Sequence, residues 1–254
     1  MKVSALFLLL VVFGVACGGG KGPSGAGTPA AGAAGSASTA GIAGLGAAGN
    51  GDGGSLPGLG GEAGALAVGG GMGGTVEPPF TSGELLINGD AEQGSTGWTA
   101  SGPDAGIVVE AYGAPDYPKA SDPGPAMRGV SFFRGSDNPN VDANQEVDLT
   151  PFADQISRGL RFKLKAHLGG YAIQNDSASV VVRLLAADGS LLESHTLGGP
   201  LSLERMGLTG LISCSLDGKL PATTRRLDVH LVMQRSGGTG NDGYADNLSL
   251  TIHN

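Results

Sequence analysis

The sequence predicts an all-β domain over residues 84–254, folded as a two-sheet sandwich of the jelly-roll kind. Three observations predict it. Apolar residues recur with a period of two rather than 3.6, and clusters of Gly, Pro, Asn and Asp separate the apolar runs. Near Glu84 the composition also changes sharply, from Gly and Ala to a mixture of charged, aromatic and branched residues. The stretch of about 170 residues is long enough for one domain with a sizeable core.

The clearest predicted strand covers residues 160–168, where apolar side chains alternate with Arg, Lys and His. That alternation is typical of an antiparallel strand with one buried face. The runs 226–234 and 247–253 repeat the pattern. The residues expected to face inward are Leu160, Phe162, Leu164, Ala166, Leu168, Leu227, Val229, Leu231, Met233, Leu248, Leu250 and Ile252.

A hairpin is predicted where Asp188-Gly189 joins the strongly apolar run 179–185 to the run 191–197. Five further runs are candidate strands: 85–88, 107–112, 127–133, 144–148 and 207–215. About ten strands with turns between them indicate a sandwich rather than a parallel sheet with crossover helices.

One short helical turn is predicted at 151–156, because Thr150 could cap it and Pro151 suits its first position. Farther along, Gly169-Gly170 before Tyr171 predicts a tight turn or a bulge.

Residues 1–16 have the form of an export signal. A single early positive charge, Lys2, precedes an apolar stretch of 13 residues from Ala5 to Cys17. A helix that crosses the hydrocarbon of a bilayer needs about 20 residues, so this stretch is not predicted to span a membrane.

Gly14-Val15-Ala16-Cys17 resembles the lipobox of bacterial lipoproteins, although Gly14 stands where that motif usually has Leu or another aliphatic residue. The resemblance implies cleavage before Cys17 and acylation of its sulfur. Several acyl chains would give lasting membrane attachment. Gly18 stands where an Asp would imply retention in the inner membrane, so the expected location is the outer membrane, on its periplasmic face or at the cell surface. The alternative is an ordinary secretory signal cut near Ala16, with Cys17 left unmodified.

Residues 17–83 are expected to form a disordered tether rich in Gly and Ala. Residues 18–79 hold 24 of the 48 glycines, and Asp52, Glu62 and Glu77 are the only charged residues between Gly22 and Pro79. So little apolar surface could not offset the entropy of ordering the backbone. A random coil of this length would span roughly 40–50 Å and hold the domain clear of a surface.

The domain carries 20 acidic and 13 basic residues. This balance argues against nucleic acid as a partner, because nucleic acid requires clustered Lys and Arg, and it disfavours polyanionic glycans for the same reason. Cys214 would be the only thiol left if Cys17 is acylated, so no internal disulfide is expected. We interpret Cys214 as a buried structural thiol rather than a nucleophile, because no catalytic context surrounds it.

Two segments carry a family resemblance. Residues 84–94 followed by Gly97-Trp98, and the closing segment 241–250, look like the first and last strands of galactose-binding-like β-sandwiches. These include carbohydrate-binding modules of the family 4, 9 and 22 type. The opening segment and Gly169-Gly170 more distantly resemble the sugar-binding domain found behind F-box motifs. The resemblance covers residues 84–254 and implies the fold more specifically than a ligand.

The resemblance also implies one structural Ca²⁺ between the opening acidic loop and the last strand. Carried over by position, its ligands are Glu92 and Asp246, with Asp90 or a backbone carbonyl near Gly94 assisting. Calcium takes six to eight oxygen ligands, which such loops supply. The alternative is that Asp90 and Asp246 are turn residues that bond their own backbone. The oxygen-rich segment 137–144 lacks the pattern of an EF-hand and is expected to be a polar hairpin connection.

Trp98, the sole tryptophan, is expected to pack in the core rather than to stack on a ligand. Ligand-binding candidates are instead the tyrosines and amide or carboxylate residues expected in loops: Tyr112, Tyr117, Tyr171, Gln174, Asn175, Asp176, Asn241 and Tyr244. A Tyr with neighbouring amides and carboxylates can stack on a sugar and bond its hydroxyls.

These observations favour a non-catalytic, membrane-anchored binding lipoprotein that recognises a neutral carbohydrate or an envelope glycan. A structural or adhesion lipoprotein that binds a protein partner or another copy is the alternative. An enzyme is disfavoured, because the acidic residues fall in no recognisable catalytic motif and the His residues lie on predicted strands or at the terminus.

Overall fold

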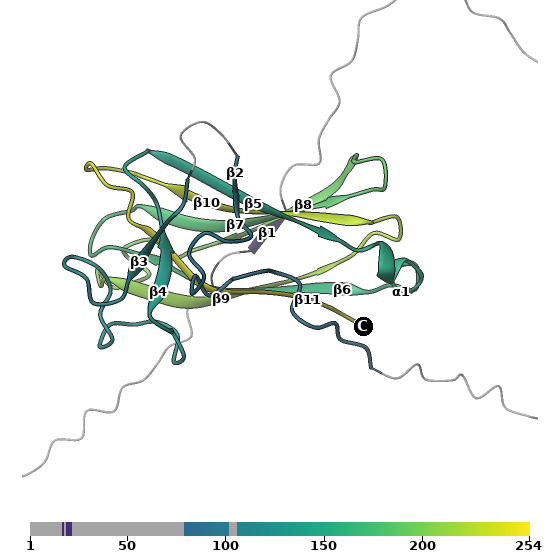
Figure 1. Ribbon diagram of the computed structural model, residues 1–254, viewed down its shortest axis with the longest axis horizontal. Coiled ribbons are helices and arrows are strands. Elements are labelled where there is room, and N and C mark those ends of the chain that lie inside the picture. Colours follow the sequence, from purple (N-terminus) through teal and green to yellow (C-terminus); the bar gives the residue numbers. More distant parts are fainter. Residues whose placement is uncertain (1–16, 18, 22–78, 102–105) are drawn as a thin grey trace, which may run out of the picture. The chain divides into compact units, whose positions relative to one another are not determined.

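The computed structural model describes residues 17, 19–21, 79–101 and 106–254, which form a sandwich of two antiparallel sheets (Figure 1). One sheet has the strand order β1-β8-β7-β10-β5-β2 and the other β3-β4-β11-β6-β9. The strands of the first sheet are β1 (Gly19–Lys21), β8 (Leu191–Gly198), β7 (Ser177–Leu185), β10 (Arg226–Gln234), β5 (Asn140–Asp148) and β2 (Thr99–Ala100). Those of the second are β3 (Val108–Ala111), β4 (Ser131–Arg134), β11 (Gly243–His253), β6 (Arg161–Gly170) and β9 (Gly210–Lys219). The predicted all-β sandwich is therefore confirmed.

The core lies between the sheets and is built from the side chains that the alternation placed on one face. On β6, Phe162, Leu164 and Leu168 are fully buried. The inward side chains expected on β10 and β11 are buried as well. Trp98 belongs to this core, as predicted: it is 8% exposed, its ring lies edge-on to Phe133, and its Nε1 donates to the Asn88 carbonyl. The period-two pattern thus predicted the buried face correctly.

Several elements differ from the expectation. Residues 85–88 form no strand. The Leu85 N–H donates to the Leu250 carbonyl of β11 at 3.0 Å, but the next backbone groups, those of Leu86 and Ile87, bond the side chains of Glu84 and Gln145. Gly169-Gly170 ends β6 instead of forming a turn. A Cβ on Gly169 would lie 2.8 Å from the Leu211 Cα, so glycine permits a close approach of β9.

The predicted helical turn is present as a 3-10 turn, η1 (Thr150–Phe152), followed by α1 (Ala153–Ser157). Thr150 does not cap it. The Thr150 N–H instead donates to the Asp148 carboxylate at 2.8 Å, and Thr150 is the first residue of the turn.

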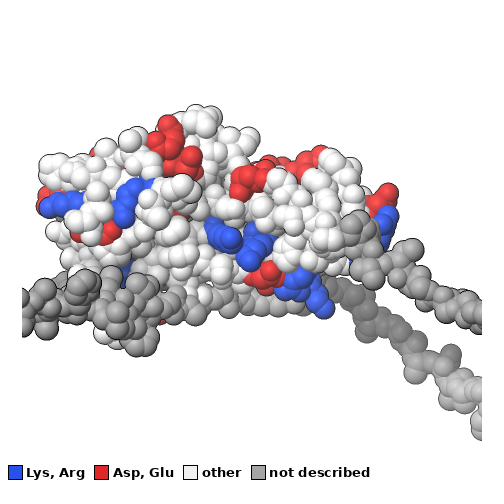
Figure 2. Space-filling model, turned by 90° about the horizontal axis from the view of Figure 1, so that it is seen from below, with Lys and Arg blue, Asp and Glu red and all other residues white. Residues whose placement is uncertain are grey.

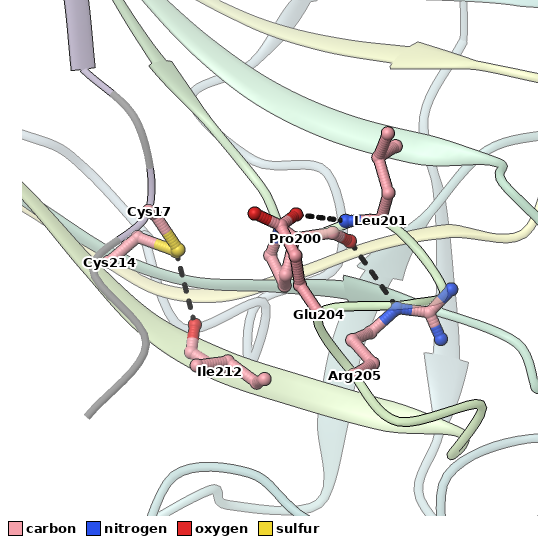
Figure 3. The surroundings of a disulfide bond; sticks show 7 residues. All are labelled: Cys17, Pro200, Leu201, Glu204, Arg205, Ile212 and Cys214. Carbon is pink, nitrogen blue, oxygen red and sulfur yellow. Dashed lines mark hydrogen bonds between the residues drawn. A yellow bond between two sulfur atoms is a disulfide. The ribbon is translucent and has the colours of Figure 1, made fainter. Parts of the chain in front are cut away.

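A segment near the N-terminus covers the side of the sandwich where β8 and β9 are the edge strands. Strand β1 pairs with β8, with Gly19 opposite Leu197 and Lys21 opposite His195. Cys17 is disulfide-bonded to Cys214 on β9 (Figure 3). The expectation that Cys214 has no disulfide partner is therefore wrong. Its buried position was predicted correctly, since Cys214 is 2% exposed.

The same disulfide bears on the predicted acylation of Cys17. A sulfur atom in a disulfide cannot also carry a thioether-linked lipid, so the two states exclude each other in one molecule. Lys21 and Pro79, which flank the undescribed residues 22–78, both belong to the sandwich unit.

The sandwich also begins earlier than residue 84. Phe80 packs against the core and contacts Phe152 in a tilted arrangement with ring centroids 6.0 Å apart, and Thr81 forms a bridge with His253. The predicted signal, residues 1–16, and most of the predicted tether lie outside the described residues. Among those that are described, no helix has the length and apolar character needed to cross a bilayer.

Antiparallel pairing places three long connections at one end of the sandwich: β6–β7, β8–β9 and β10–β11. The β3–β4 connection, residues 112–130, lies at the same end, opposite α1 (Figure 1). Most of the loop residues singled out as ligand candidates come from these four connections.

Candidate functional site

An open pocket of about 340 Å³ lies among these loops. Its walls come from the β3–β4, β6–β7 and β8–β9 connections, with Asp242 of the β10–β11 connection on an adjoining hollow. The residues that line the pocket are Asp116, Tyr117, Lys119, Asp122, Pro123, Tyr171, Ala172, Gly207, Leu208 and Thr209. Of the eight predicted ligand residues, the pocket brings together Tyr117 and Tyr171.

Tyr117 is held by aromatic packing beneath it. Its ring lies 6.2 Å from that of Phe132 and 6.3 Å from that of Tyr244, and the Arg134 guanidinium lies 5.1 Å from its centroid. Burial raises the pKa of the Tyr117 hydroxyl, which therefore stays protonated at neutral pH and can donate a hydrogen bond. Tyr171 packs partly buried against the same cluster of Phe132, Leu211 and Tyr244. Both rings are thus fixed before any ligand arrives.

An arginine holds each wall of the pocket. Arg128 donates to the carbonyls of Lys119, Asp122 and Pro125 and so fixes one wall. Arg205, 2% exposed, fixes the other. Its guanidinium donates to five carbonyl groups, those of Gly170, Ala172, Gln174, Pro200 and Leu208. Burial lowers the pKa of Arg205, but a guanidinium remains charged at any physiological pH.

Three predicted ligand residues are instead internal braces of the loops. Asp176 is fully buried and accepts from the Ser236 N–H and hydroxyl and from the Asp242 N–H. Asn241 is 1% exposed and donates to carbonyls that include that of Met233 at 3.2 Å. Tyr244 is fully buried, with its hydroxyl donating to Asp242. These side chains position the pocket without lining it.

The remaining three candidates do not line the pocket either. Asn175 Oδ1 accepts from the Ser202 hydroxyl at 2.6 Å and links the β6–β7 connection to the β8–β9 connection. The Gln174 carbonyl accepts from Arg205, while its side-chain oxygen is buried. Tyr112 stacks on Phe132 at 4.9 Å and donates to Asp246 at 2.7 Å, away from the pocket.

Two of the predicted calcium ligands, Glu92 and Asp246, each accept hydrogen bonds from other groups of the protein. Glu92 accepts from the backbone N–H groups of Val130 and Ser131 at 2.8 and 2.9 Å, and Asp246 from the Tyr112 hydroxyl and the Asn247 N–H. Burial and, to a smaller extent, the nearby charges of Glu92 and Asp90 raise the pKa of Asp246 to about 7, although its hydrogen bonds from Tyr112 and Asn247 act in the opposite direction. Within the described part of the chain, however, no three acidic, His or Cys side chains form a group able to hold a metal.

Sequence reasoning missed four charged residues of the site, Asp116, Lys119, Asp122 and Asp242, and both bracing arginines. The segment 114–125 contains four prolines and no alternation, which marks it as a long loop, but nothing in it shows which strand end it covers. Arg205 sits among leucines in the run 201–208, and an isolated Arg in such a run is a signal for a buried brace.

Comparisons with protein-family models and with curated proteins find no match for the chain. Among solved structures, the chain is similar to the enzymatically active domain of tailspike protein 4 of bacteriophage CBA120, with 15% identity and a TM-score of 0.46 over 66% of this chain and 21% of that one. It is similar to a family 16 carbohydrate-binding module, with 23% identity and a TM-score of 0.42 over 65% of this chain and 98% of that one. It is also similar to a cyclase from Fischerella sp. TAU, with 12% identity and a TM-score of 0.47 over 68% of this chain and 98% of that one. At these values the likenesses describe an arrangement of strands and carry no conclusion about a ligand.

Proposed function

We propose that the sandwich is a binding module that holds a neutral carbohydrate in the pocket between Tyr117 and Tyr171. The observation that carries the proposal is the pair of preorganised tyrosine rings beside polar groups in an open pocket. Aromatic faces pack on the apolar faces of sugar rings, and hydroxyl, carboxylate and ammonium groups bond sugar hydroxyls. Fixing the rings before binding lowers the entropic cost of association.

The charges favour an uncharged ligand. Three carboxylates and one ammonium surround the pocket and its adjoining hollow, those of Asp116, Asp122, Asp242 and Lys119. A polyanionic glycan would be repelled by that excess of negative charge. Figure 2 shows acidic and basic side chains in separate small groups on one face, without the continuous basic area that a polyanion requires.

The proposed role is binding without catalysis. Carboxylates at the pocket are engaged by the loops themselves, since Asp122 accepts from the Lys119 N–H at 2.8 Å and Asp242 from the Tyr244 hydroxyl at 3.1 Å. Groups held in this way suit a rigid binding surface.

Paired substitutions test the proposal. Tyr171→Ala should weaken binding of a glycan at least about tenfold by titration calorimetry, whereas Tyr171→Phe, which keeps the ring, should retain most of it. Tyr112→Phe removes a hydroxyl outside the pocket and serves as the matched control. Equal affinity in the Ala and Phe variants would exclude stacking on Tyr171.

We further propose that an acylated form of the chain is displayed on the outer membrane. The sequence Gly14-Val15-Ala16-Cys17 supports it. Because the Cys17 sulfur is used in the disulfide, this proposal concerns molecules in which Cys17 is acylated and Cys214 keeps its thiol. Growth with a radiolabelled fatty acid, followed by membrane fractionation, tests it, with Cys17→Ser as the control.

A further inference from the structure

Three strongly exposed apolar side chains lie together beside the pocket. Leu203 is 87% exposed, Met206 81% and Ile173 81%. Leu203 and Met206 belong to the β8–β9 connection, and Ile173 belongs to the β6–β7 connection. We call these three residues the apolar rim. Single exposed apolar residues are ordinary, whereas a group on adjoining loops points to a binding role.

The apolar rim is held in place by its own loop. The Met206 N–H donates to the Leu203 carbonyl at 3.0 Å, and the Gly207 N–H donates to the Ser202 carbonyl at 2.8 Å. In the same turn, the buried Arg205 donates to the Pro200 carbonyl, and Glu204 accepts from the Leu201 N–H (Figure 3). The same guanidinium reaches the Ala172 and Gln174 carbonyls on either side of Ile173. One buried arginine thus fixes both loops that carry the rim.

The apolar rim is continuous with the pocket. Gly207 and Leu208, which line the pocket, directly follow Met206, and Tyr171 and Ala172 directly precede Ile173. A Cβ on Gly207 would lie 3.3 Å from the Ile173 Cγ2, so the two loops touch there. The opposite wall carries Asp116, Lys119 and Asp122. The pocket is therefore polar on one side and opens onto exposed hydrocarbon on the other.

We propose that the ligand is an amphipathic glycoside, with its sugar in the pocket and its alkyl or acyl chain across the apolar rim. The proposal rests on the proposed carbohydrate binding and names the ligand class more closely. A single ligand that extends from the charged wall past Leu208 must be polar at one end and apolar at the other. Each methylene fully removed from water strengthens binding about fourfold, so even partial contact with the rim is measurable.

The test uses the full chain and pairs of glycosides that share a sugar. Methyl and octyl β-D-glucosides, β-D-galactosides and β-D-maltosides are titrated below the micelle concentration of the octyl compounds. For a sugar that binds, we expect the octyl form to bind at least about tenfold more tightly than the methyl form. Leu203→Ser/Met206→Asn should remove this difference and leave the methyl glycoside unaffected. Met127→Ser, which removes an 88% exposed Met from another loop, should keep the difference in affinity between the octyl and methyl glycosides.

The outcomes separate this inference from the proposed function. Equal affinity for methyl and octyl forms overturns the amphipathic ligand and leaves carbohydrate binding intact. Binding of octyl tetraethylene glycol, which has the chain but no sugar, as tightly as an octyl glycoside overturns both. Self-association of the wild-type chain in sedimentation, lost in Leu203→Ser/Met206→Asn, would assign the rim to a contact between copies and overturn the inference.

Discussion

Cys17 and Cys214 are bonded across 197 residues and join a segment near the N-terminus to β9, while β1 beside Cys17 pairs with β8. Without β1, β8 would be the edge of its sheet, on the same side of the sandwich as β9, which is an edge of the other sheet. An uncovered edge presents unpaired N–H and C=O groups to other chains. The disulfide therefore fastens a cover over this side of the fold.

Removing the disulfide should destabilise the domain. A cross-link that closes so long a loop contributes about 2–5 kcal/mol by restricting the unfolded chain. We expect Cys17→Ser to lower the free energy of unfolding by that amount in urea titrations. A reducing agent should lower the wild type to the same value and leave Cys17→Ser unchanged. If the reducing agent leaves the free energy of unfolding of the wild type unchanged, the disulfide is contradicted.

Mass spectrometry of a proteolytic digest distinguishes a disulfide-bonded Cys17 sulfur from an acylated one. In the oxidised protein, a nonreducing digest should contain a peptide pair that links Cys17 to Cys214. In an acylated protein, the Cys17 peptide should instead carry the mass of the lipid, and Cys214 should react with iodoacetamide after unfolding. Both signals on one molecule are chemically excluded.

Arg205 should control the order of the pocket. Arg205→Met leaves five buried or half-buried carbonyls without their donor, and we expect a loss of about 2–4 kcal/mol in the free energy of unfolding. Cleavage by a protease within 199–209 should become faster. Lys165→Met, which removes an exposed cation from β6, should change neither property. Unchanged protease resistance in Arg205→Met would refute its bracing role.

His230 should make stability fall at alkaline pH. Its ring lies 2.8 Å from the Asp142 carboxylate and 2.9 Å from that of Asp228, which also pairs with Arg183. Burial lowers the pKa of His230, but the two carboxylates outweigh it, and the pKa is raised overall. The stabilisation of the fold by protonated His230 beside these carboxylates is therefore complete below the ordinary pKa of about 6.5. It is lost as pH rises through the higher pKa of the folded state.

His230→Gln should flatten this part of the stability profile, measured by urea unfolding between pH 6 and pH 9. Lys165→Gln, which replaces an exposed cation on β6, is the control and should keep the slope. The interpretation fails if His230→Gln leaves the profile unchanged.

We propose that Ca²⁺ can bind at Asp246 if Glu92 turns away from the backbone donors it now holds. With a pKa of about 7, Asp246 stays protonated in the folded state between about pH 4 and 7, whereas it ionises in the unfolded state. The free energy of unfolding therefore falls as the pH rises through that range. At pH 8 a cation would offset the buried charge. Calcium should then raise Tm by a few degrees, roughly 2–4 °C for each kcal/mol. Asp246→Asn should abolish the rise, and no change with calcium or EDTA would exclude the site.

The parts of the fold that follow from local sequence were predictable. Alternation fixed the buried faces of β6, β10 and β11, and Asp188-Gly189 marked its hairpin, with Gly189 at φ 85°. The pairing of β1 was not predictable, because three residues of Gly-Gly-Lys carry no apolar pattern and form a strand only against an existing edge. The disulfide was missed for a related reason, since Cys17 was interpreted from its neighbours in sequence alone.

The site was predictable only in part. Loop position was enough to single out Tyr117 and Tyr171, but it could not distinguish them from Tyr244, which alternation along β11 turns toward the buried Phe132. Residues such as Asp176 and Asn241 look like ligand groups in a sequence. Their use as braces depends on contacts with Ser236 and Met233, about 60 and 8 positions away.

Binding of the chain to an array of neutral glycans tests the central claim most directly, with Tyr117→Ala/Tyr171→Ala measured beside the wild type. Thermal unfolding of both proteins shows whether the variant remains folded. We predict that the wild type binds a defined set of neutral glycans and that the folded double variant loses all of them. An array on which the wild type binds nothing, or on which both proteins bind alike, would contradict a carbohydrate site at these two tyrosines.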